Sequence, residues 1–329
     1  MSASTFRIER HIPSAPPGRG AAAPGTGVLR HPSLTTTVPK EFVHRAGVAE
    51  VMLTDWDRTG DDRFTVSAQW PRGHSFFTME DRYSPLIAAE TIRQAGILLA
   101  HTEYGVPLDQ QFLVGDIRVS ARGEHFGVGW TPAALELDVV VLEAKRRGET
   151  LTGLSVTVEI RREGRLAATG GGSFTCVTPP VYRRLRAPHL PGDGRPRVMA
   201  LTAPVPPQTV GRISPTDVVL SPTGKPGRWQ LRVDTAHPAL FDHPLDHVPG
   251  MMLLEAARQA TVATLGPSCM PLEITSEFRR YTELSSPCVI ETCRIPTAGT
   301  APGQSVLVTG HQNGELAFRC LATVPAPPG

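Results

Sequence analysis

The residues with the clearest chemical potential form one polar set that occurs twice. Each set places a carboxylate, a guanidinium and an amide inside a stretch rich in Leu, Ile, Met and Ala. The sets are Glu90, Arg93 and Gln94 within "LIAAETIRQA" (86–95), and Glu255, Arg258 and Gln259 within "MMLLEAARQA" (251–260). If both stretches are helical, positions i, i+3 and i+4 share a face, so each set forms a polar stripe. Burying an unpaired charge costs several kcal/mol, so these charges must be paired or used.

Two interpretations of the stripes are open. In the structural one, each Glu and Arg form an ordinary intrahelical pair facing water. In the functional one, the two helices lie side by side around a shared cleft. There a glutamate partly removed from water has a raised pKa and acts as a general base, while an arginine holds an anion. The recurrence of the set favours the second, with Glu255, Arg258, Glu90 and Arg93 as catalytic candidates and Gln94 and Gln259 as binding candidates.

The turn "FDHPLDHVPG" (241–250) adds further binding candidates. His243 and His247 lie in it, and Gly250 opens the predicted helix, so that free N–H groups there suit a carbonyl gaining negative charge. Arg45 and Arg212 are weaker candidates, because an arginine beside a strand start is usually structural. Histidines in a polar turn are also often structural. Their spacing does not indicate a metal site, and no cofactor is expected.

The elements that must position these residues come from an internal duplication. "VHRAGVAEVMLTDW" (43–56) aligns with "VGRISPTDVVLSPT" (210–223) at an offset of 167 residues, and the two polar sets align at 165. Chance matches would not keep one order and nearly one spacing. We predict repeats at 40–178 and 205–325, after a Pro/Gly-rich segment at 1–39. The Pro-rich segment 179–204 is predicted to be an extended linker.

Periodicity within each half predicts one long helix, at about 85–103 and 250–265, followed by several strands. The alternation in "RFTVSAQW" (63–70) is typical of a half-buried strand, and four more strands follow the first helix without another helix between them. This is not a doubly wound pattern. It predicts an α+β protein in which an antiparallel sheet wraps around one long central helix in each repeat.

Composition sets limits on the class of protein. The chain has 329 residues, a formal net charge of +2 and 40% hydrophobic residues, so a bulk attraction to nucleic acid or membrane is not implied. The five cysteines show no CxxC spacing, and no apolar run is long enough for a membrane span. We therefore expect a cytoplasmic protein with reduced thiols.

The motifs resemble two related families. "DHVPGMMLLEAARQA" (246–260) looks like the helix start of hotdog acyl-carrier-protein dehydratases, although the catalytic "HFPG" turn of those enzymes is replaced here by "FDHPLDH". A resemblance over nearly the whole chain is to the A-factor biosynthesis family, which has tandem hotdog repeats. It rests on "VHR…AEVMLTDW", "DRYSPLIAAETIRQAGI", "VGR" and "HPLDHVPGMMLLEAARQA" in this order.

The second resemblance implies an acyltransferase of signalling-molecule synthesis. Such an enzyme moves a β-ketoacyl group from acyl carrier protein to the hydroxyl of dihydroxyacetone phosphate, leading to a butenolide phosphate precursor of a γ-butyrolactone or a related furan. On this reading Glu255 or Glu90 takes the hydroxyl proton, Gly250 polarises the thioester, and Arg258 and Arg93 hold the phosphate or orient the carboxylates. Basic clusters at 183–186 and 279–280 are candidate docking sites for the carrier protein.

Three points stay open at this level. Another hotdog thioester enzyme, a dehydratase or thioesterase, would release product without the phosphate-bearing alcohol. A non-catalytic protein that binds an acyl lactone would show binding without turnover. The molecule is either a monomeric pseudo-dimer or a homodimer.

Overall fold

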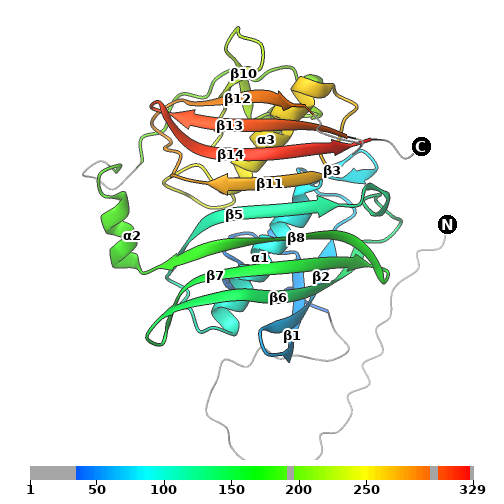
Figure 1. Cartoon of the computed structure of the whole chain (residues 1–329), viewed down its shortest axis with the longest axis vertical. Helices are drawn as coiled ribbons and strands as arrows, with labels where there is room; N and C mark the ends of the chain where they lie inside the picture. Colours follow the sequence, from blue (N-terminus) through cyan, green and yellow to red (C-terminus); the bar gives the residue numbers. More distant parts are fainter. Residues whose placement is uncertain (1–34, 191–195, 297–302, 327–329) are drawn as a thin grey trace, which may run out of the picture. The chain divides into compact units, whose positions relative to one another are not determined.

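The computed structural model describes residues 35–190, 196–296 and 303–326. Contacts divide the chain into two units, Met1–Thr35 and Thr36–Gly329, and all the described helices and strands belong to the second. Twelve of its strands form one antiparallel sheet, in the order β1-β2-β6-β7-β8-β5-β11-β14-β13-β12-β10-β9 (Figure 1). The first six of these strands come from the first half of the chain and the other six from the second half. β5 pairs with β11 and so joins the two halves.

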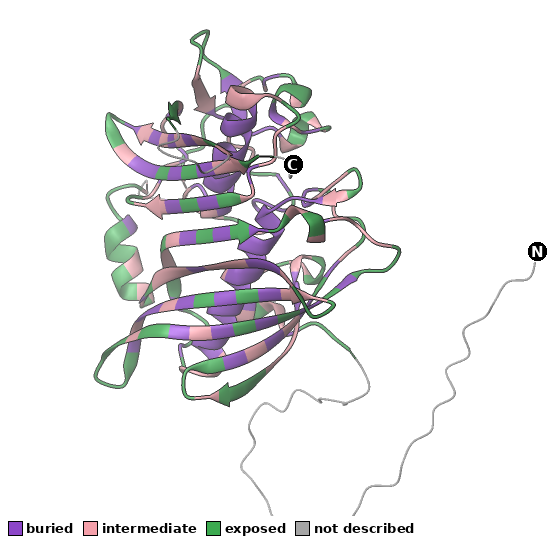
Figure 2. Cartoon of the chain, turned by 45° about the vertical axis from the view of Figure 1, so that its right-hand side comes forward, coloured by how far each residue is buried: buried purple, intermediate pink, exposed green. Residues whose placement is uncertain are grey.

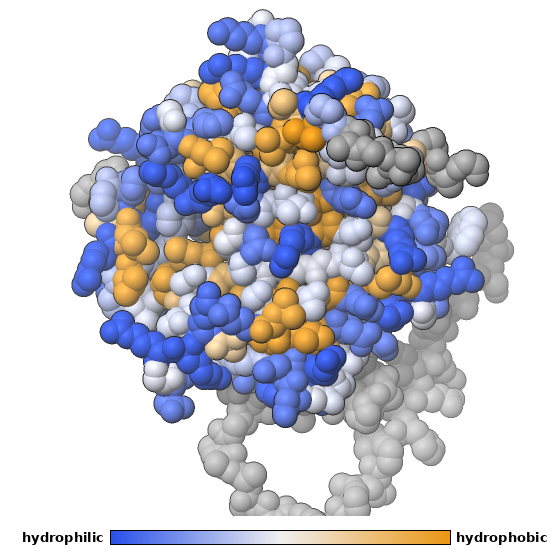
Figure 3. Space-filling model, in the orientation of Figure 1, coloured by the Kyte–Doolittle hydropathy of each residue, from blue (hydrophilic) through white to orange (hydrophobic). Residues whose placement is uncertain are grey.

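The strands match the predicted alternation closely. In the first half they are β1 (Leu53–Gly60), β2 (Arg63–Trp70), β5 (Gln111–Ala121), β6 (Ala133–Arg147), β7 (Thr150–Arg162) and β8 (Arg165–Val177), with a small separate pair β3 (Thr78–Met79) and β4 (Arg82–Tyr83). In the second half they are β9 (Leu220–Pro222), β10 (Arg228–Leu231), β11 (Glu273–Phe278), β12 (Cys288–Ile295), β13 (Gly303–Gln312) and β14 (Glu315–Pro325). The outer face of the sheet carries apolar patches separated by charged side chains (Figure 3).

Two long helices lie against the other face of this sheet. α1 (Leu86–Thr102) buries 15 of its 17 residues and α3 (Gly250–Leu265) buries 12 of its 16, and both appear as continuous buried segments in Figure 2. Pro249 precedes α3 with extended backbone, and Gly266 ends it with φ of +118°, a conformation that favours glycine. The two helices contact each other as well as the sheet. The predicted fold class, a tandem hotdog, is confirmed.

The segment between the halves differs from the expected extended linker. A helix, α2 (Pro179–Arg186), begins there with two prolines in its first turn, and Arg186 is buried. Proline is tolerated at the start of a helix because the first N–H groups need no intrahelical acceptor. The proline content of this segment therefore does not exclude a helix, and the expectation of extended chain is wrong for these eight residues.

The part of the chain that the structure describes contains no helix long and apolar enough to cross a membrane.

Candidate functional site

The polar stripe of α3 lies in the interior of the protein. An arginine from outside the helix, Arg212, also binds its glutamate. Glu255 is fully buried, and both its oxygens accept from Arg258, at 2.8 Å from Nε to Oε2 and 2.7 Å from Nη2 to Oε1. Arg212 Nε donates to Oε1 at 2.8 Å, and Gln259 Nε2 donates to the same oxygen at 2.6 Å. Gln259 also accepts from the backbone N–H of Val219. The amide therefore ties the cluster to the neighbouring backbone.

The stripe of α1 is built in the same way. Arg93 Nε and Nη2 donate to Glu90 at 2.9 and 2.8 Å, and Gln94 Nε2 donates at 2.6 Å. Arg45 takes the place of Arg212, with its Nε 2.9 Å and its Nη2 2.6 Å from the two carboxylate oxygens. The duplication has therefore preserved a complete cluster of four side chains. Arg45 and Arg212, which looked like the weaker candidates in the sequence, belong to these clusters.

The expected rise of the glutamate pKa values is wrong. Burial alone would raise the pKa of Glu255, but the guanidinium groups of Arg212 and Arg258 outweigh it and lower the pKa to about 2. Arg45 and Arg93 have the same effect on Glu90, whose pKa is also about 2 despite burial. Both carboxylates are held ionised, and their oxygens are occupied by four or five donors. This arrangement suits a structural anchor better than a general base.

The clusters also hold the two repeats against each other. Arg45 Nη1 donates to the backbone oxygen of Ala239 and to Asp242, each at 3.3 Å. In the reverse direction, Arg212 Nη1 donates to the backbone oxygen of Phe76 at 2.6 Å, and its guanidinium lies over the Phe76 ring at 4.1 Å. Each arginine thus bridges the glutamate of its own repeat and the turn that precedes the helix of the other.

Two histidines that were not among the candidate residues, His74 and His237, occupy matching positions in these turns. His74 and His237 each accept two backbone N–H groups at Nδ1, and each places Nε2 near a carboxylate, Glu50 at 3.3 Å and Asp217 at 3.2 Å. Their equivalent bonds show that they stabilise equivalent turns. The offset of 163 between them, close to that of the helices, was the signal in the sequence.

A cavity of about 320 Å³ lies where the two repeats meet. From the first repeat it is lined by Phe112 and its neighbours on β5. From the second it is lined by His247 and Gly250 at the start of α3, and by Arg279 and Arg280 after β11. Ligand sites are commonly found in such clefts between structural units. The structure therefore brings the predicted His247 and Gly250 together at one cavity.

A narrower apolar slot, of about 30 Å³, lies next to this cavity. It shares Phe112 and Val114 with it and runs between α1 and the sheet, where Gly96 and Phe174 face one another across the slot. Arg93 lines the slot, and within the described residues its Nη1 has no hydrogen-bond partner. Arg93 is thus the catalytic candidate that reaches this slot, whereas Glu90, Glu255 and Arg258 are almost completely buried.

The start of α3 offers free backbone donors to the cavity. Within the described residues the N–H groups of Gly250 and Met251 have no acceptor, while Met252 and Leu253 donate to the oxygen of Pro249. Gly250 is packed closely, since a Cβ there would lie 3.2 Å from the Phe278 ring. Such N–H groups can stabilise an oxygen that gains negative charge.

His243 lies apart from this arrangement. Its Nδ1 is 2.5 Å from Asp242, the carboxylate that accepts from Arg45 and from the N–H of Ala46. A further histidine pair, His44 and His101, lies behind Phe112 with Nε2 atoms 2.9 Å apart. Burial is the main cause that lowers the pKa of His44, to about 3. Among the described residues no group of His, Cys, Asp or Glu side chains is arranged to hold a metal ion.

Comparison with known proteins identifies close relatives. The profile of a family described as the A-factor biosynthesis hotdog domain matches residues 29–178 and 195–324. A protein of Streptomyces virginiae named 2-oxo-3-(phosphooxy)propyl 3-oxoalkanoate synthase is 51% identical over 291 residues, covering 88% of this chain and 97% of that protein. A protein of the same name from Streptomyces coelicolor is 43% identical, covering 88% and 92%.

Solved structures show more distant similarity. A thioesterase from Novosphingobium aromaticivorans is 17% identical with a TM-score of 0.45, and covers 83% of this chain and 98% of its own. The 12:0-ACP thioesterase from Umbellularia californica is 12% identical with a TM-score of 0.47, and covers 79% and 93%.

Proposed function

Because the chain belongs to the A-factor biosynthesis hotdog family, we propose that it transfers a 3-oxoacyl group from a thioester to the hydroxyl of dihydroxyacetone phosphate. Its relatives are named as synthases of the 2-oxo-3-(phosphooxy)propyl ester of a 3-oxoalkanoate, and the chain is an enzyme. The observation that carries the proposal is the 51% identity to one such synthase along 97% of its length. The ester then closes to a butenolide phosphate, the precursor of a γ-butyrolactone.

We assign the two parts of the acyl donor to the cavity of about 320 Å³ and to the slot of about 30 Å³, which has to widen to admit an alkyl chain. The apolar slot beside Gly96 takes the alkyl chain, which places the thioester at the junction with the larger cavity. There the Gly250 N–H polarises the thioester carbonyl, because it is free and close to the lining. Arg93 donates to the 3-oxo oxygen from within the slot. Glu90 has the supporting role of holding that arginine in place, as Glu255 does for Arg258 and Arg212.

The acyl donor is acyl carrier protein. Arg279 and Arg280 line the cavity. α2, which carries the exposed Arg183 and Arg184, lies near the same edge of the molecule as the end of β11 (Figure 1). An acidic carrier protein would be attracted to this basic rim. Arg186 does not belong to it, because it is buried in ion pairs with Asp246 and Glu283. We also place the enzyme in the cytoplasm, where its five free cysteines would stay reduced.

The test is turnover of 3-oxoacyl carrier protein with dihydroxyacetone phosphate, followed by mass spectrometry of the ester. Release of carrier-protein thiol should require the phosphate-bearing alcohol. Release at the same rate without it would identify a thioesterase, and loss of water from a 3-hydroxyacyl substrate would identify a dehydratase. Tight binding of an acyl lactone with no thiol release would identify a binding protein.

A further inference from the structure

One imidazole at the cavity is held by a carboxylate and has a free nitrogen. His247 Nδ1 lies 2.6 Å from Asp246 Oδ1, and within the described residues Nε2 has no hydrogen-bond partner. The ring packs against Tyr281 with 4.7 Å between centroids, and it lines the cavity together with Gly250. A histidine whose Nδ1–H donates to a carboxylate presents Nε2 as a proton acceptor.

The carboxylate that holds this histidine is itself fixed by α2. Tyr182 OH donates to Asp246 Oδ1 at 2.6 Å, and Arg186 Nε donates to Oδ2 at 3.0 Å. The same guanidinium donates through Nη1 and Nη2 to Glu283, both at 2.7 Å, and lies 4.5 Å above the Tyr281 ring. Arg186 therefore joins the segment before α3 to the segment after β11. Burial alone would raise the pKa of Asp246, but its bonds from His247, Tyr182 and Arg186 lower it.

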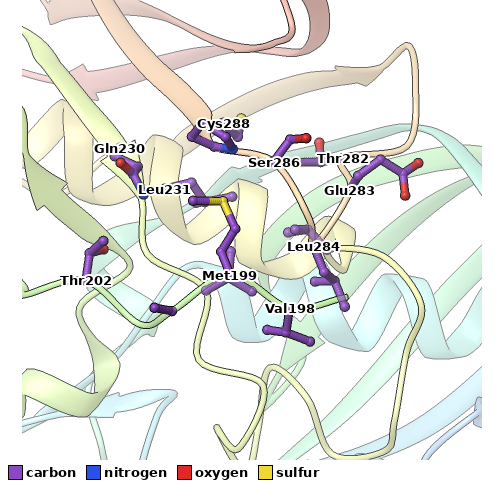
Figure 4. Close-up of a pocket in the computed structure, with 14 residues that line it drawn as sticks. Val198, Met199, Thr202, Gln230, Leu231, Thr282, Glu283, Leu284, Ser286 and Cys288 are labelled. Carbon is purple, nitrogen blue, oxygen red and sulfur yellow. The ribbon is translucent and has the colours of Figure 1, made fainter. Parts of the chain in front are cut away.

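The chain that follows α2 supports the same segment from the other side. Met199 N donates to the backbone oxygen of Leu284 at 3.0 Å, and the Met199 side chain points toward Leu231 in Figure 4. This packing leaves a cavity of only about 20 Å³, room for about one water. Glu283 points away from it (Figure 4), and its carboxylate is free to hold Arg186. The connection between the repeats thus contributes to the site.

We propose that His247 is the general base of the acyl transfer and that Arg186 of α2 is its positioning residue. This inference rests on the proposed function. The acceptor hydroxyl oxygen attacks the thioester carbonyl carbon as its proton passes to His247 Nε2. The tetrahedral intermediate then collapses with cleavage of the C–S bond, and the leaving sulfur takes the proton back from the imidazolium. The products are the ester and the free thiol, and Asp246 stays ionised throughout.

The charges around His247 come from three elements. Asp246 precedes it, Glu283 lies opposite it across an isolated β-bridge, and Arg186 from α2 contacts both acids. Tyr182 and Tyr281 lie on the side of α2, and His189 Nδ1, just after α2, is 3.5 Å from Glu283 Oε1. The guanidinium groups of Arg279 and Arg280 line the same cavity. Loss of Arg186 would leave two carboxylates near the imidazole without their shared cation, which favours the protonated ring.

The first experiment replaces the base. His247→Gln should lower kcat by about 10²- to 10⁴-fold and remove the acidic limb of the pH–kcat profile, with the KM for dihydroxyacetone phosphate changed little. His311→Gln, on β13 away from the cavity, is the matched control. It should keep the wild-type kcat and the acidic limb of the pH–kcat profile. For a variant that folds poorly, His247→Ala supplied with imidazole provides a second measurement, and rate recovery is expected.

The results separate the inference from the function. Ester formation by the wild type together with an unchanged rate and acidic limb in His247→Gln would overturn the base assignment and leave the function standing. Failure of imidazole to raise the rate of a folded His247→Ala would also count against it. No ester from the wild type would overturn both.

The second experiment tests the positioning role. Arg186→Met should lower kcat about tenfold or more and move the acidic limb to higher pH, and Arg186→Lys should recover part of that movement. Arg232→Met is the matched control, because Arg232 is also buried but donates to the oxygens of Thr202 and Val218. Arg232→Met should lower the stability of the protein and leave the acidic limb of the pH–kcat profile at the wild-type pH. If the Arg186→Met and Arg232→Met variants have the same pH–kcat profile per folded enzyme, Arg186 has only a structural role.

Discussion

At the residue scale, a buried carboxylate is useful as a base only if one oxygen is available to a substrate proton. Glu255 and Glu90 fail this requirement because arginine and glutamine donors occupy their oxygens. The charge of each glutamate is balanced by two guanidinium groups. Removing the charge would leave those cations buried without a counter-ion, which is among the more costly changes a protein interior can undergo.

Glu255→Gln should therefore act on stability. At pH 7 it should lower the free energy of unfolding by about 3–5 kcal/mol, the range for breaking a buried pair by removing one partner. Because the folded-state pKa of about 2 is below the ordinary 4.5, the ionised glutamate contributes stability above about pH 4.5 that is lost as the pH falls toward 2. The free energy of unfolding can be measured by urea titrations at a series of pH values from 7 to 2. Between about pH 4.5 and 2 it should change less steeply with pH for Glu255→Gln than for the wild type.

Glu90→Gln provides the matching test in the first repeat, with the same expected direction. A Glu255→Gln protein of unchanged stability that has lost all turnover would restore the glutamate as the base.

At the element scale, the slot between α1 and the sheet depends on a glycine of α1, because Gly96 lies opposite Phe174 of β8. A Cβ at Gly96 would lie 3.2 Å from Phe174 Cε1 and 3.9 Å from Val156 Cγ2, so any side chain here narrows the slot. Three glycines of β8 lie nearby, and a Cβ at Gly170 would fall 2.6 Å from the Ile92 side chain of α1. Helix and sheet therefore approach each other closely along the slot, whose volume is only about 30 Å³.

Gly96→Ala should change the preferred acyl chain length. We expect kcat/KM for long 3-oxoacyl donors to fall by about 10- to 100-fold relative to short ones, since one methylene in an apolar pocket is worth about 1–3 kcal/mol. The measurement is a series of donors of increasing chain length. Gly73→Ala is the control, because an added Cβ there meets no atom within 4 Å. An equal fall in kcat/KM for donors of all chain lengths would show that the acyl chain does not bind in this slot.

How far the sequence predicted these elements depends on the kind of information each required. The helices of 86–102 and 250–265 and the strands after them were predictable, because periodicity is local and the duplication supplied each pattern twice. The sign of the glutamate pKa shift was not predictable. Arg45 and Arg212 are more than 40 residues from Glu90 and Glu255 in the sequence, so their distance to the carboxylates depends on the fold. The role of α2 was hidden for the same reason, since Arg186 contacts residues 60 and 97 positions later.

At the scale of the whole molecule, the duplication has produced two similar structural clusters. The segments that lead into α1 and α3, here called the helix entrances, differ from each other. The clusters are nearly equivalent, and each arginine crosses to the other repeat. The α3 entrance has the sequence Asp246-His247-Val248-Pro249-Gly250, whereas the α1 entrance reads "DRYSPL" at 81–86. Only the α3 entrance brings a histidine and its carboxylate to a helix start, and this asymmetry favours the second repeat for the chemistry.

The proposed docking of the carrier protein belongs to the same scale, because Arg279 and Arg280 would attract the partner before any substrate atom reaches the cavity. Arg279 and Arg280 are half-exposed or more and pair with Glu277 and Glu315 at the surface. Exposed pairs contribute little to stability, so their loss should not unfold the protein. Charges at the edge of an interface mainly alter the rate of association and its dependence on salt.

Arg280→Glu should therefore raise the apparent KM for 3-oxoacyl carrier protein about tenfold and leave turnover of a small pantetheine thioester unchanged. Raising the salt concentration should reduce the difference between wild type and variant, because the attraction is screened. Arg165→Glu is the matched control, since Arg165 is exposed at the β7–β8 turn away from the rim. A raised KM for dihydroxyacetone phosphate with both donors would instead assign Arg280 to the phosphate. Equal KM values for wild type and variant would place carrier-protein docking elsewhere on the surface.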